Sequence, residues 1–317
     1  MPSSSLRVIS PSYLQRMKAS DFHVLHTVTD YTRYYGLPAP AHPLLTLIDL
    51  AQITGQVIPA PIVAQLYTVA LKRGLKGTVY YGRQTYDFHE GLLTFLAPGQ
   101  VVLADPSLDI SEMTGWALVF HPDLLRKYPL GQKIRTYGFF SYQVHEALHV
   151  SAAEECLLEH VLGSIRHETE QPLDVFSQDL LVAQLGVLLG YANRFYHRQF
   201  LTRRLAEHDL LSRFEARLTA HFAQGANHPL PTVQQFADEL HVSPAYLSDL
   251  LRALTGQTAQ QHLHHALIEK AKLLLLSTSL TVNETAFRLG FEYPHYFTRL
   301  FKRKTGLTPA AFRVSAP

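Results

Sequence analysis

Sulfur-containing residues are scarce in this sequence, which has one cysteine and three methionines among 317 residues. Because a lone thiol, Cys156, cannot form a disulfide within the chain, a disulfide-stapled extracellular domain is excluded and a reducing, cytoplasmic location is expected. Residues 1–20 lack the apolar run of a signal peptide. The longest apolar stretch, residues 180–192, is interrupted by Gln184 and Gly186 and is shorter than the ~20 residues that cross a bilayer, so no membrane span is expected.

The motifs of several enzyme classes are missing as well. The sequence has no nucleophile elbow, no phosphate-binding P-loop and no dinucleotide-binding fingerprint. Its 18 histidines include a cluster at His262, His264 and His265, but none has the Cys/His spacing of a structural zinc site, and solvent exposure or helix packing is the expected role. We therefore expect no enzymatic activity, no metal and no other cofactor.

One pentapeptide does match an enzyme motif. Residues 145–149, with the sequence HEALH, fit the H-E-x-x-H pattern of zinc proteases, which needs both histidines on one helical turn. Ser151, with Glu154 three residues later, forms a capping box that predicts a helix start after the pentapeptide. We therefore expect the pentapeptide to lie in a turn, without a protease site.

Charge is sparse, at 17% of residues, and unevenly distributed. Residues 228–317 hold 9 Lys+Arg against 6 Asp+Glu, whereas the rest of the chain holds 19 against 20. The run from Tyr293 to Arg313 contains no acid, and its basic residues are Arg299, Lys302, Arg303, Lys304 and Arg313. Such a run is either a solvated face or a surface that contacts phosphate.

The order of sequence patterns predicts an α+β multidomain protein. A chain of this length has room for about two domains, because single cores seldom grow past roughly 250 to 300 residues. From about Pro43 to Phe140, short apolar, β-branched and aromatic runs alternate with turn residues, which predicts an all-β sandwich or barrel. The predicted strands are residues 44–50, 67–72, 77–82, 92–96, 101–104 and 116–120.

Helical periodicity follows the β region. It predicts a helix after Ser151 and further helices over about residues 178–200 and 209–222, before a Gly-, Asn- and Pro-containing linker at residues 224–231. On the second helix, Leu181, Leu185, Leu188, Ala192 and Phe195 form one apolar stripe, which either packs on the β region or mediates dimerisation. These patterns divide the chain into residues 1–150, 151–223 and 224–317.

The last region contains an internal repeat at an offset of 50 residues. The matched pairs are Tyr246/Tyr296, Leu247/Phe297, Leu250/Leu300, Leu251/Phe301, Arg252/Lys302, Thr255/Thr305, Gly256/Gly306 and Thr258/Thr308. Eight matched positions of like chemistry indicate a repeated structural element.

Each copy of the repeat predicts a helix, a tight turn and a second helix. Thr232 with Gln235 forms a capping box that begins the first helix of the first copy, and Thr281 with Glu284 caps that of the second. Ser243-Pro244 begins the second helix of the first copy. Gly290 suits a turn with positive φ, and His241 occupies the corresponding place in the first copy. A helix over residues 259–276, about 27 Å long, joins the copies and can hold two recognition helices in successive major grooves of DNA.

The repeat resembles the DNA-binding domain of the AraC/XylS family of bacterial transcription regulators. The residues that carry the resemblance are Ala286, Gly290, Phe291, Tyr296, Phe297, Arg299, Phe301, Lys302, Gly306, Thr308, Pro309 and Arg313. The resemblance implies two helix-turn-helix motifs that bind double-stranded DNA. It also implies a homodimer, a small organic effector bound by the N-terminal region and contact with RNA polymerase.

The resemblance also indicates which side chains contact DNA. By motif position these are Ser243, Ala245, Ser248, Asp249 and Arg252 in the first motif and His295, Thr298, Arg299 and Lys302 in the second. Arg299 is predicted to read guanine, and Arg252 and Lys302 to contact phosphates. Asp249 either accepts a hydrogen bond from cytosine, is turned away from the DNA, or pairs with Arg252. Phe297, Leu300 and Phe301 are predicted core residues.

The N-terminal half resembles the cupin-like sensory domain of the same family. Gly91, Leu92, Phe95, Pro98 and Gly99 carry this resemblance, which implies a metal-free β-barrel because only His89-Glu90 approaches the metal-binding cupin pattern. The aromatic residues Tyr80, Tyr81, Tyr86 and Trp116 are candidates for a pocket wall or for the core.

The function predicted from these features is effector-controlled transcription regulation, in which effector binding or dimer contacts reposition the DNA-binding domains. Two alternatives remain open. One is a regulator of the same type without an effector, and the other is a metal-dependent cupin enzyme fused to a DNA-binding module.

Overall fold

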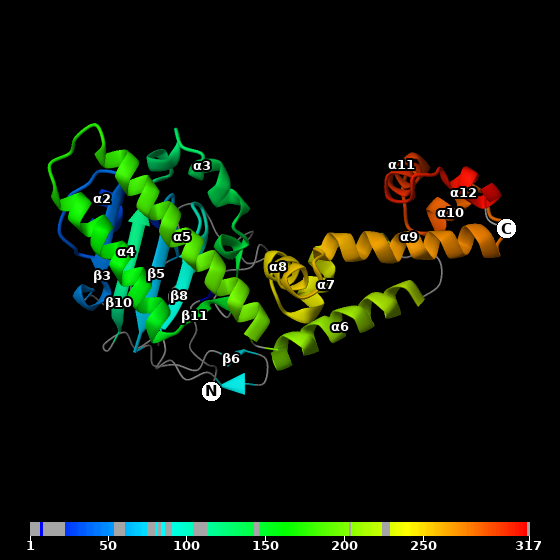
Figure 1. Ribbon diagram of the computed structural model, residues 1–317, viewed down its shortest axis with the longest axis horizontal. Helices are drawn as coiled ribbons and strands as arrows, with labels where there is room; N and C mark the ends of the chain where they lie inside the picture. Colours follow the sequence, from blue (N-terminus) through cyan, green and yellow to red (C-terminus); the bar gives the residue numbers. More distant parts are fainter. Residues whose placement is uncertain are drawn as a thin grey trace. The chain divides into compact units, whose positions relative to one another are not determined.

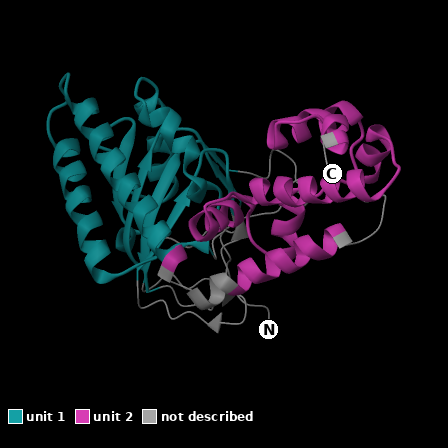
Figure 2. Cartoon of the chain, turned by 45° about the vertical axis from the view of Figure 1, so that its right-hand side comes forward, with its two compact units in different colours: residues 1–199 teal, residues 200–317 magenta. Residues whose placement is uncertain are grey.

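A computed structural model describes residues 7–8, 23–53, 61–74, 80–81, 84–85, 91–103, 113–142, 146–202, 204–223 and 229–315. The chain forms two compact units, residues 1–199 and 200–317 (Figure 2). The second unit therefore includes residues 200–223, which the sequence-based division places before the DNA-binding domain. No helix in the described part of the chain combines the length and the apolar composition that a membrane span requires.

The first compact unit contains two sheets and a short hairpin (Figure 1). The larger sheet is antiparallel, with the strand order β11 (Leu148–Val150), β8 (Gly91–Leu96), β5 (Tyr67–Arg73), β10 (Thr114–Phe120) and β3 (Leu45–Asp49). The smaller sheet has the order β1 (Arg7–Val8), β9 (Val101–Leu103), β4 (Ile62–Ala64) and β2 (His23–Leu25). The hairpin consists of β6 (Tyr80–Tyr81) and β7 (Gln84–Thr85).

The expectation of a closed β-barrel is wrong for the part of the chain that the structure describes. The larger sheet ends at β3 and β11, and neither strand pairs with a second described strand. The strands of the smaller sheet have only two or three residues each, which is too few to continue a hydrogen-bonded ladder around a barrel. The N-terminal region is sheet-rich and open at these edges.

Five of the six predicted strands are confirmed by β3, β5, β8, β9 and β10, with Ala104 outside the described residues. Of the predicted strand 77–82, only β6 is described. The sequence did not predict the short strands β1, β2, β4, β7 and β11. Two or three residues cannot show a period-2 alternation, so pattern analysis has no signal to find there.

The two faces of the larger sheet carry different layers of core. On β5, Ala70 faces a cluster with Val28 and Ile48, which includes the first residue of α2 (Val28–Tyr34). The opposite face is covered by α4 (Ala152–Glu170) and α5 (Ser177–Thr202), which lie side by side in Figure 1. The remaining short helices are η2 (Leu50–Gln52), η3 (Pro122–Leu125), α3 (Leu130–Lys133), η4 (Ile134–Thr136) and η5 (Gly138–Ser141).

The apolar stripe predicted on the second helix is buried within the chain. Leu181, Leu185, Leu188 and Ala192 of α5 have no exposed surface, and Phe195 is almost fully buried. The stripe is therefore core, which is one of the two alternatives that the sequence left open. Any contact that α5 makes with a second molecule must use its opposite side.

The HEALH segment does not form an α-helix in its described part. Leu148 and His149 lie on β11, where His149 pairs with Leu92, so they form a strand rather than the expected turn. α4 begins after the segment, and both hydrogen bonds of the predicted Ser151/Glu154 capping box are present. His145, like His89 and Glu90, lies outside the described residues.

The second compact unit is helical. Its elements are α6 (Arg204–Ala223), α7 (Val233–Leu240), α8 (Pro244–Thr255), α9 (Ala259–Ser277), α10 (Val282–Arg288), α11 (Pro294–Thr305) and α12 (Pro309–Ser315). α6 packs on this unit through Phe214, whose ring contacts Phe236 of α7 and His262 of α9. The ring of His262 also bonds to the hydroxyl of Thr255 at 2.8 Å, so packing is its observed role.

Candidate nucleic-acid interface

Two helix-turn-helix motifs are arranged along one central helix. α7 and α8 form the first motif and α10 and α11 the second, and α9 connects them (Figure 1). With 19 residues at about 1.5 Å per residue, α9 is ~28 Å long. Its apolar side is buried against both motifs, which fixes their separation within this compact unit.

The helix starts follow the capping residues that the sequence predicts. The hydroxyl of Thr232 accepts from the amide of Gln235 at 3.2 Å, and that of Thr281 accepts from Glu284 at the same distance. Only the second box is complete, because the Glu284 carboxylate returns a bond to the amide of Thr281 at 2.7 Å, whereas the Gln235 side chain bonds to Glu239. The first helix of the second motif therefore begins with more of its backbone amides hydrogen-bonded than that of the first motif.

The two turns have the same backbone arrangement despite different residues. The amide of Val242 donates to the carbonyl of Ala237 at 3.0 Å, and the equivalent bond from Phe291 to Ala286 is also 3.0 Å. His241 has φ 60° and is the sole non-glycine residue with positive φ in the described ranges, while Gly290 has φ 90°. The left-handed turn conformation predicted at both positions is confirmed.

Both recognition helices bury the face that the repeat predicts as core. Phe297 and Phe301 of α11 are fully buried and Leu300 is half-buried, and their repeat partners Leu247, Leu250 and Leu251 are fully buried in α8. The matched tyrosines differ, because Tyr246 is 0% exposed and Tyr296 is 48% exposed. Sequence comparison of the two copies gave no signal for this difference.

On α8, the candidate DNA-contacting residues form a mixed surface. Ala245 and Ser248 are half-buried. The carboxylate of Asp249 lies 3.2 Å from Nη1 of Arg252, which confirms the pairing that the sequence left as one alternative. Ser243 is 4% exposed and its hydroxyl accepts from the amide of Tyr246, so this side chain caps α8.

On α11, the candidate residues present cations without acid partners. His295, Arg299 and Lys302 are exposed and Thr298 is half-buried. Arg299 lies over the ring of Tyr296, with 5.3 Å between the guanidinium carbon and the ring centroid. No acidic side chain in the described part of the chain pairs with Arg299 or Lys302.

One member of the basic run has a structural role. Nε of Arg313 donates to the carbonyl of Leu275 at 2.9 Å, and Nη2 donates to that of Leu280 at 2.5 Å. These bonds tie α12 to the end of α9 and to the segment before α10. Because its donors face backbone carbonyls, Arg313 does not belong with the phosphate-contacting cations.

Comparison with known proteins gives the family of this region. A helix-turn-helix domain family matches residues 236–315. The HTH-type transcriptional activator RhaR of Escherichia coli O139:H28 is 30% identical over 153 residues, which are 48% of this chain and 52% of that protein. Residues 236–315 are therefore a helix-turn-helix domain of the type found in AraC/XylS regulators.

The match to this AraC/XylS relative, and the equal match to RhaR of Shigella boydii serotype 4, span about half the length of those proteins. Among solved structures, the C-terminal domain of AraT from Geobacillus stearothermophilus is 34% identical, covering 34% of this chain and 85% of that one, with a TM-score of 0.31. The DNA-binding domain of AdpA in complex with a target DNA is 26% identical, covering 33% of this chain and 90% of that one, with a TM-score of 0.29.

Proposed function

We propose that this protein is a cytoplasmic, sequence-specific DNA-binding transcription regulator in which α11 supplies the main base readout. The observation that carries the proposal is the exposed cationic side of α11, where Arg299 and Lys302 have no acid partner in the described part of the chain. Guanidinium groups free of carboxylates are the commonest readers of guanine in the major groove. On α8 the corresponding surface carries an ion pair instead, so its part in base readout is smaller.

The roles of the candidate residues follow from this arrangement. Arg299 reads guanine, and Lys302 and Arg252 contact phosphates. His295 and Thr298 lie beside Arg299, and Ala245 and Ser248 occupy the corresponding places on α8. Ser243 acts through its cap, because its buried hydroxyl sets where α8 begins.

The test is the binding of Arg299→Ala to DNA selected by the wild-type chain from a random-sequence pool. We expect a loss of one guanine-dependent position and a roughly 5- to 150-fold weaker affinity, since a bidentate contact contributes about 1–3 kcal/mol. Arg288→Ala, which removes the same charge from the exposed end of α10, is the matched control. If Arg299→Ala binds the selected DNA as tightly as the control does, the assignment of the recognition helix is wrong.

Control by a small organic effector in the N-terminal region is part of the same proposal. The core between the sheets contains polar groups, and burial raises the pKa of Tyr31 well above its ordinary value and that of Tyr35 to about 12. The two phenols hydrogen-bond to each other, and we propose that the effector binds beside them. Trp116 lies on the sheet face opposite Ala70 and is buried, which favours its core alternative, while the side chains of Tyr80, Tyr81 and Tyr86 lie outside the described residues.

Two measurements separate this proposal from its alternatives. A metabolite library should contain a compound that raises the melting temperature of the full chain, because a ligand that binds only the folded state stabilises it. If no compound does so, the effector-independent regulator is the better description. Stoichiometric zinc, iron or manganese in the purified protein would instead support the metal-dependent cupin enzyme fused to a DNA-binding module.

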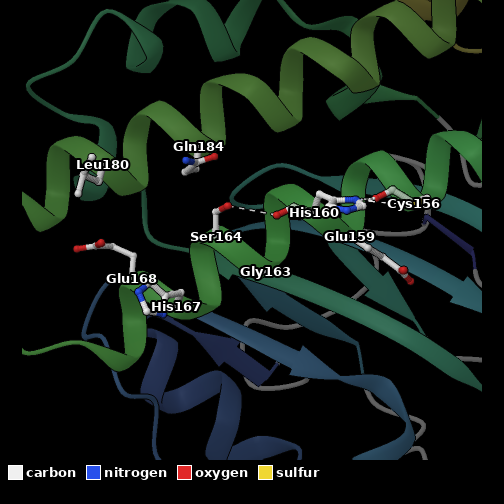
Figure 3. Close-up of a pocket in the computed structure, with 9 residues that line it drawn as sticks. All are labelled: Cys156, Glu159, His160, Gly163, Ser164, His167, Glu168, Leu180 and Gln184. Atoms are coloured by element: carbon white, nitrogen blue, oxygen red, sulfur yellow. Dashed lines mark hydrogen bonds between the residues drawn. The ribbon is translucent and has the colours of Figure 1, made fainter.

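A homodimer through the outer side of α4 and α5 completes the proposal. An open groove of about 670 Å³ runs between these helices, and Figure 3 shows it lined from Cys156 and Gly163 on α4 to Leu180 on α5. Most of the large apolar side chains exposed in the first compact unit gather on or between these helices, namely Leu157, Leu173, Val175, Phe176, Leu180 and Val187. The groove itself is lined mainly by polar residues, and Leu180 is the one member of this apolar group that lines it. Exposed apolar side chains gathered in one region are typical of a protein interface.

Analytical ultracentrifugation tests the dimer. Val187→Asp places a charge in the middle of the exposed side of α5, and we expect it to shift the full chain from dimer to monomer. Val24→Asp, an exposed valine on β2 changed in the same way, should leave the dimer intact. Equal sedimentation of the wild-type chain and Val187→Asp would exclude this surface. Contact with RNA polymerase, which the family resemblance implies, has no surface assigned to it.

A further inference from the structure

A hollow of about 360 Å³ lies between the two helix-turn-helix motifs, away from the residues assigned to DNA contact. Three segments line it: the turn after α8, one side of α9 and the end of α11. Its polar residues are Gln257, Gln261, His264, His265, Lys272 and Lys304, together with one acid, Glu269. None of the nine candidate DNA-contacting residues lines this hollow, which we call the α9 pocket.

The charges of the α9 pocket are not balanced. Its one acid is already neutralised, because Nζ of Lys272 lies 2.7 Å from the carboxylate of Glu269. Lys304 has no acid partner among the described residues. The pKa of His264 is lowered first by burial and then by the positive charges of Lys304 and Arg303, so both cations lie near its ring. An anion placed beside them is attracted by their charge.

The uncharged side chains of the pocket present donors. The amide oxygen of Gln261 accepts from the backbone amide of Thr258 at 2.7 Å, which leaves its nitrogen available to donate. The side-chain nitrogen of Gln260 lies 2.9 Å from Nε2 of His264. Because an amide nitrogen only donates, Nε2 accepts this bond and the ring proton of His264 lies on Nδ1, where it can be donated.

We propose that the α9 pocket binds a phosphate group, which bridges the connecting helix α9 and the second helix-turn-helix motif. Phosphate suits the pocket because its several acceptor oxygens match donors that come from separate segments, and because charge-assisted bonds from lysine are strong. The phosphate belongs either to the backbone of bound DNA or to a free phosphorylated small molecule. In both cases it ties Lys304 of α11 to His264 and Gln261 of α9.

The first arm of the test uses the full chain and inorganic phosphate at constant ionic strength. The ring resonance of His264, assigned with His264→Gln, should shift saturably with phosphate in the wild-type chain. Lys304→Gln should weaken the apparent affinity at least fivefold, and Lys304→Arg, which keeps the charge, should restore most of it. Lys270→Gln is the control, because Lys270 is a lysine of α9 that does not line the pocket.

The second arm measures binding to DNA selected from a random pool by the wild-type chain, as a function of salt. If the pocket holds a DNA phosphate, Lys304→Gln should lower the slope of log Kobs against log salt by ~0.9, and Lys270→Gln should leave it unchanged. An unchanged slope with saturable phosphate binding assigns the pocket to a free phosphorylated molecule. No specific His264 shift together with an unchanged slope overturns the proposal, and the binding of DNA by the wild-type chain remains a separate result.

Discussion

The guanidinium carbon of Arg299 lies 5.3 Å from the ring centroid of Tyr296, so the cation proposed to read guanine is held against an aromatic face. In the first motif, Asp249 occupies the place of Arg299 in the 50-residue repeat, and it holds Arg252 at 3.2 Å. On α11, Tyr296 thus orients Arg299 without neutralising its charge. On α8, Asp249 neutralises the charge of Arg252.

Removing the ring of Tyr296 should weaken DNA binding. An exposed cation–π contact contributes ~0.5–1 kcal/mol, which corresponds to a two- to fivefold loss of affinity for the selected DNA in Tyr296→Ala. Tyr296→Phe keeps the ring face and should bind as the wild-type chain does, measured by fluorescence anisotropy. Phe287→Ala, an exposed aromatic residue of α10, controls for the loss of apolar surface. Equal losses in the Ala and Phe variants of Tyr296 would point to its hydroxyl instead.

Asp249→Asn should strengthen DNA binding. The substitution removes the carboxylate that competes with DNA phosphate for Arg252, so this contact strengthens and the slope of log Kobs against log salt should steepen, by at most ~0.9. Asp238→Asn, on the exposed side of α7, makes the same change of charge and should leave the slope unaltered. A weaker affinity confined to sites with one particular cytosine would show that Asp249 accepts from that base, which is the alternative that its pairing does not support.

His241→Gly should stabilise the second compact unit. A non-glycine residue in the left-handed region is strained by ~1–2 kcal/mol, and glycine returns part of this through its larger entropy in the unfolded chain, so we expect a net gain of ~0.5–1 kcal/mol. His241→Val, with a β-branched side chain at the same φ, should destabilise the unit. Calorimetry of the full chain measures both, and a lower melting temperature for His241→Gly would mean that the imidazole makes a stabilising contact.

Arg313→Ala should lower stability by about 2 kcal/mol without changing the salt dependence of DNA binding. The substitution leaves the carbonyls of Leu275 and Leu280 without their charged donors, and such bonds contribute ~1.5–3 kcal/mol each at most. Urea unfolding measures the loss of stability, and the slope of log Kobs against log salt measures the salt dependence of DNA binding. A shallower slope with unchanged stability would return Arg313 to the phosphate-contacting group predicted from the sequence.

The capping box of α10 should make this helix sensitive to acid. The pKa of Glu284 is lowered from its ordinary value of 4.5, first by the bond from the backbone amide of Thr281 and then by that from its hydroxyl. A lowered pKa in the folded state means that the stabilisation is present above pH ~4.5 and is lost as the pH falls through the folded-state pKa. Carboxyl NMR titration should show a higher pKa in Thr281→Val, and Thr281→Ser should keep the wild-type value.

Much of the second compact unit was predictable because its signals are local. Caps such as Thr281, the positive φ of His241 and Gly290, and the buried positions of α8 and α11 all depend on residues within one or two turns of each other. Longer strands such as β5 and β10 carry enough alternation to be recognised.

The features that could not be predicted from the sequence depend on contacts between residues that are far apart along the chain. Barrel closure requires β3 and β11 to find partners, which a strand pattern does not specify. Arg313 reads as one more cation in a basic run, and its role comes from carbonyls 33 and 38 residues away. Tyr246 and Tyr296 occupy equivalent positions of the repeat, so only packing could separate them.

The contrast between these two tyrosines bears on how the protein can diverge. Tyr246 is fully buried in the core, so most substitutions there lower the stability of the fold more than they alter DNA recognition. Tyr296 lies on an exposed surface, where substitutions are usually close to neutral for stability. Single mutations at position 296 can therefore change how Arg299 is held at low cost to the fold, whereas mutations at position 246 affect folding first.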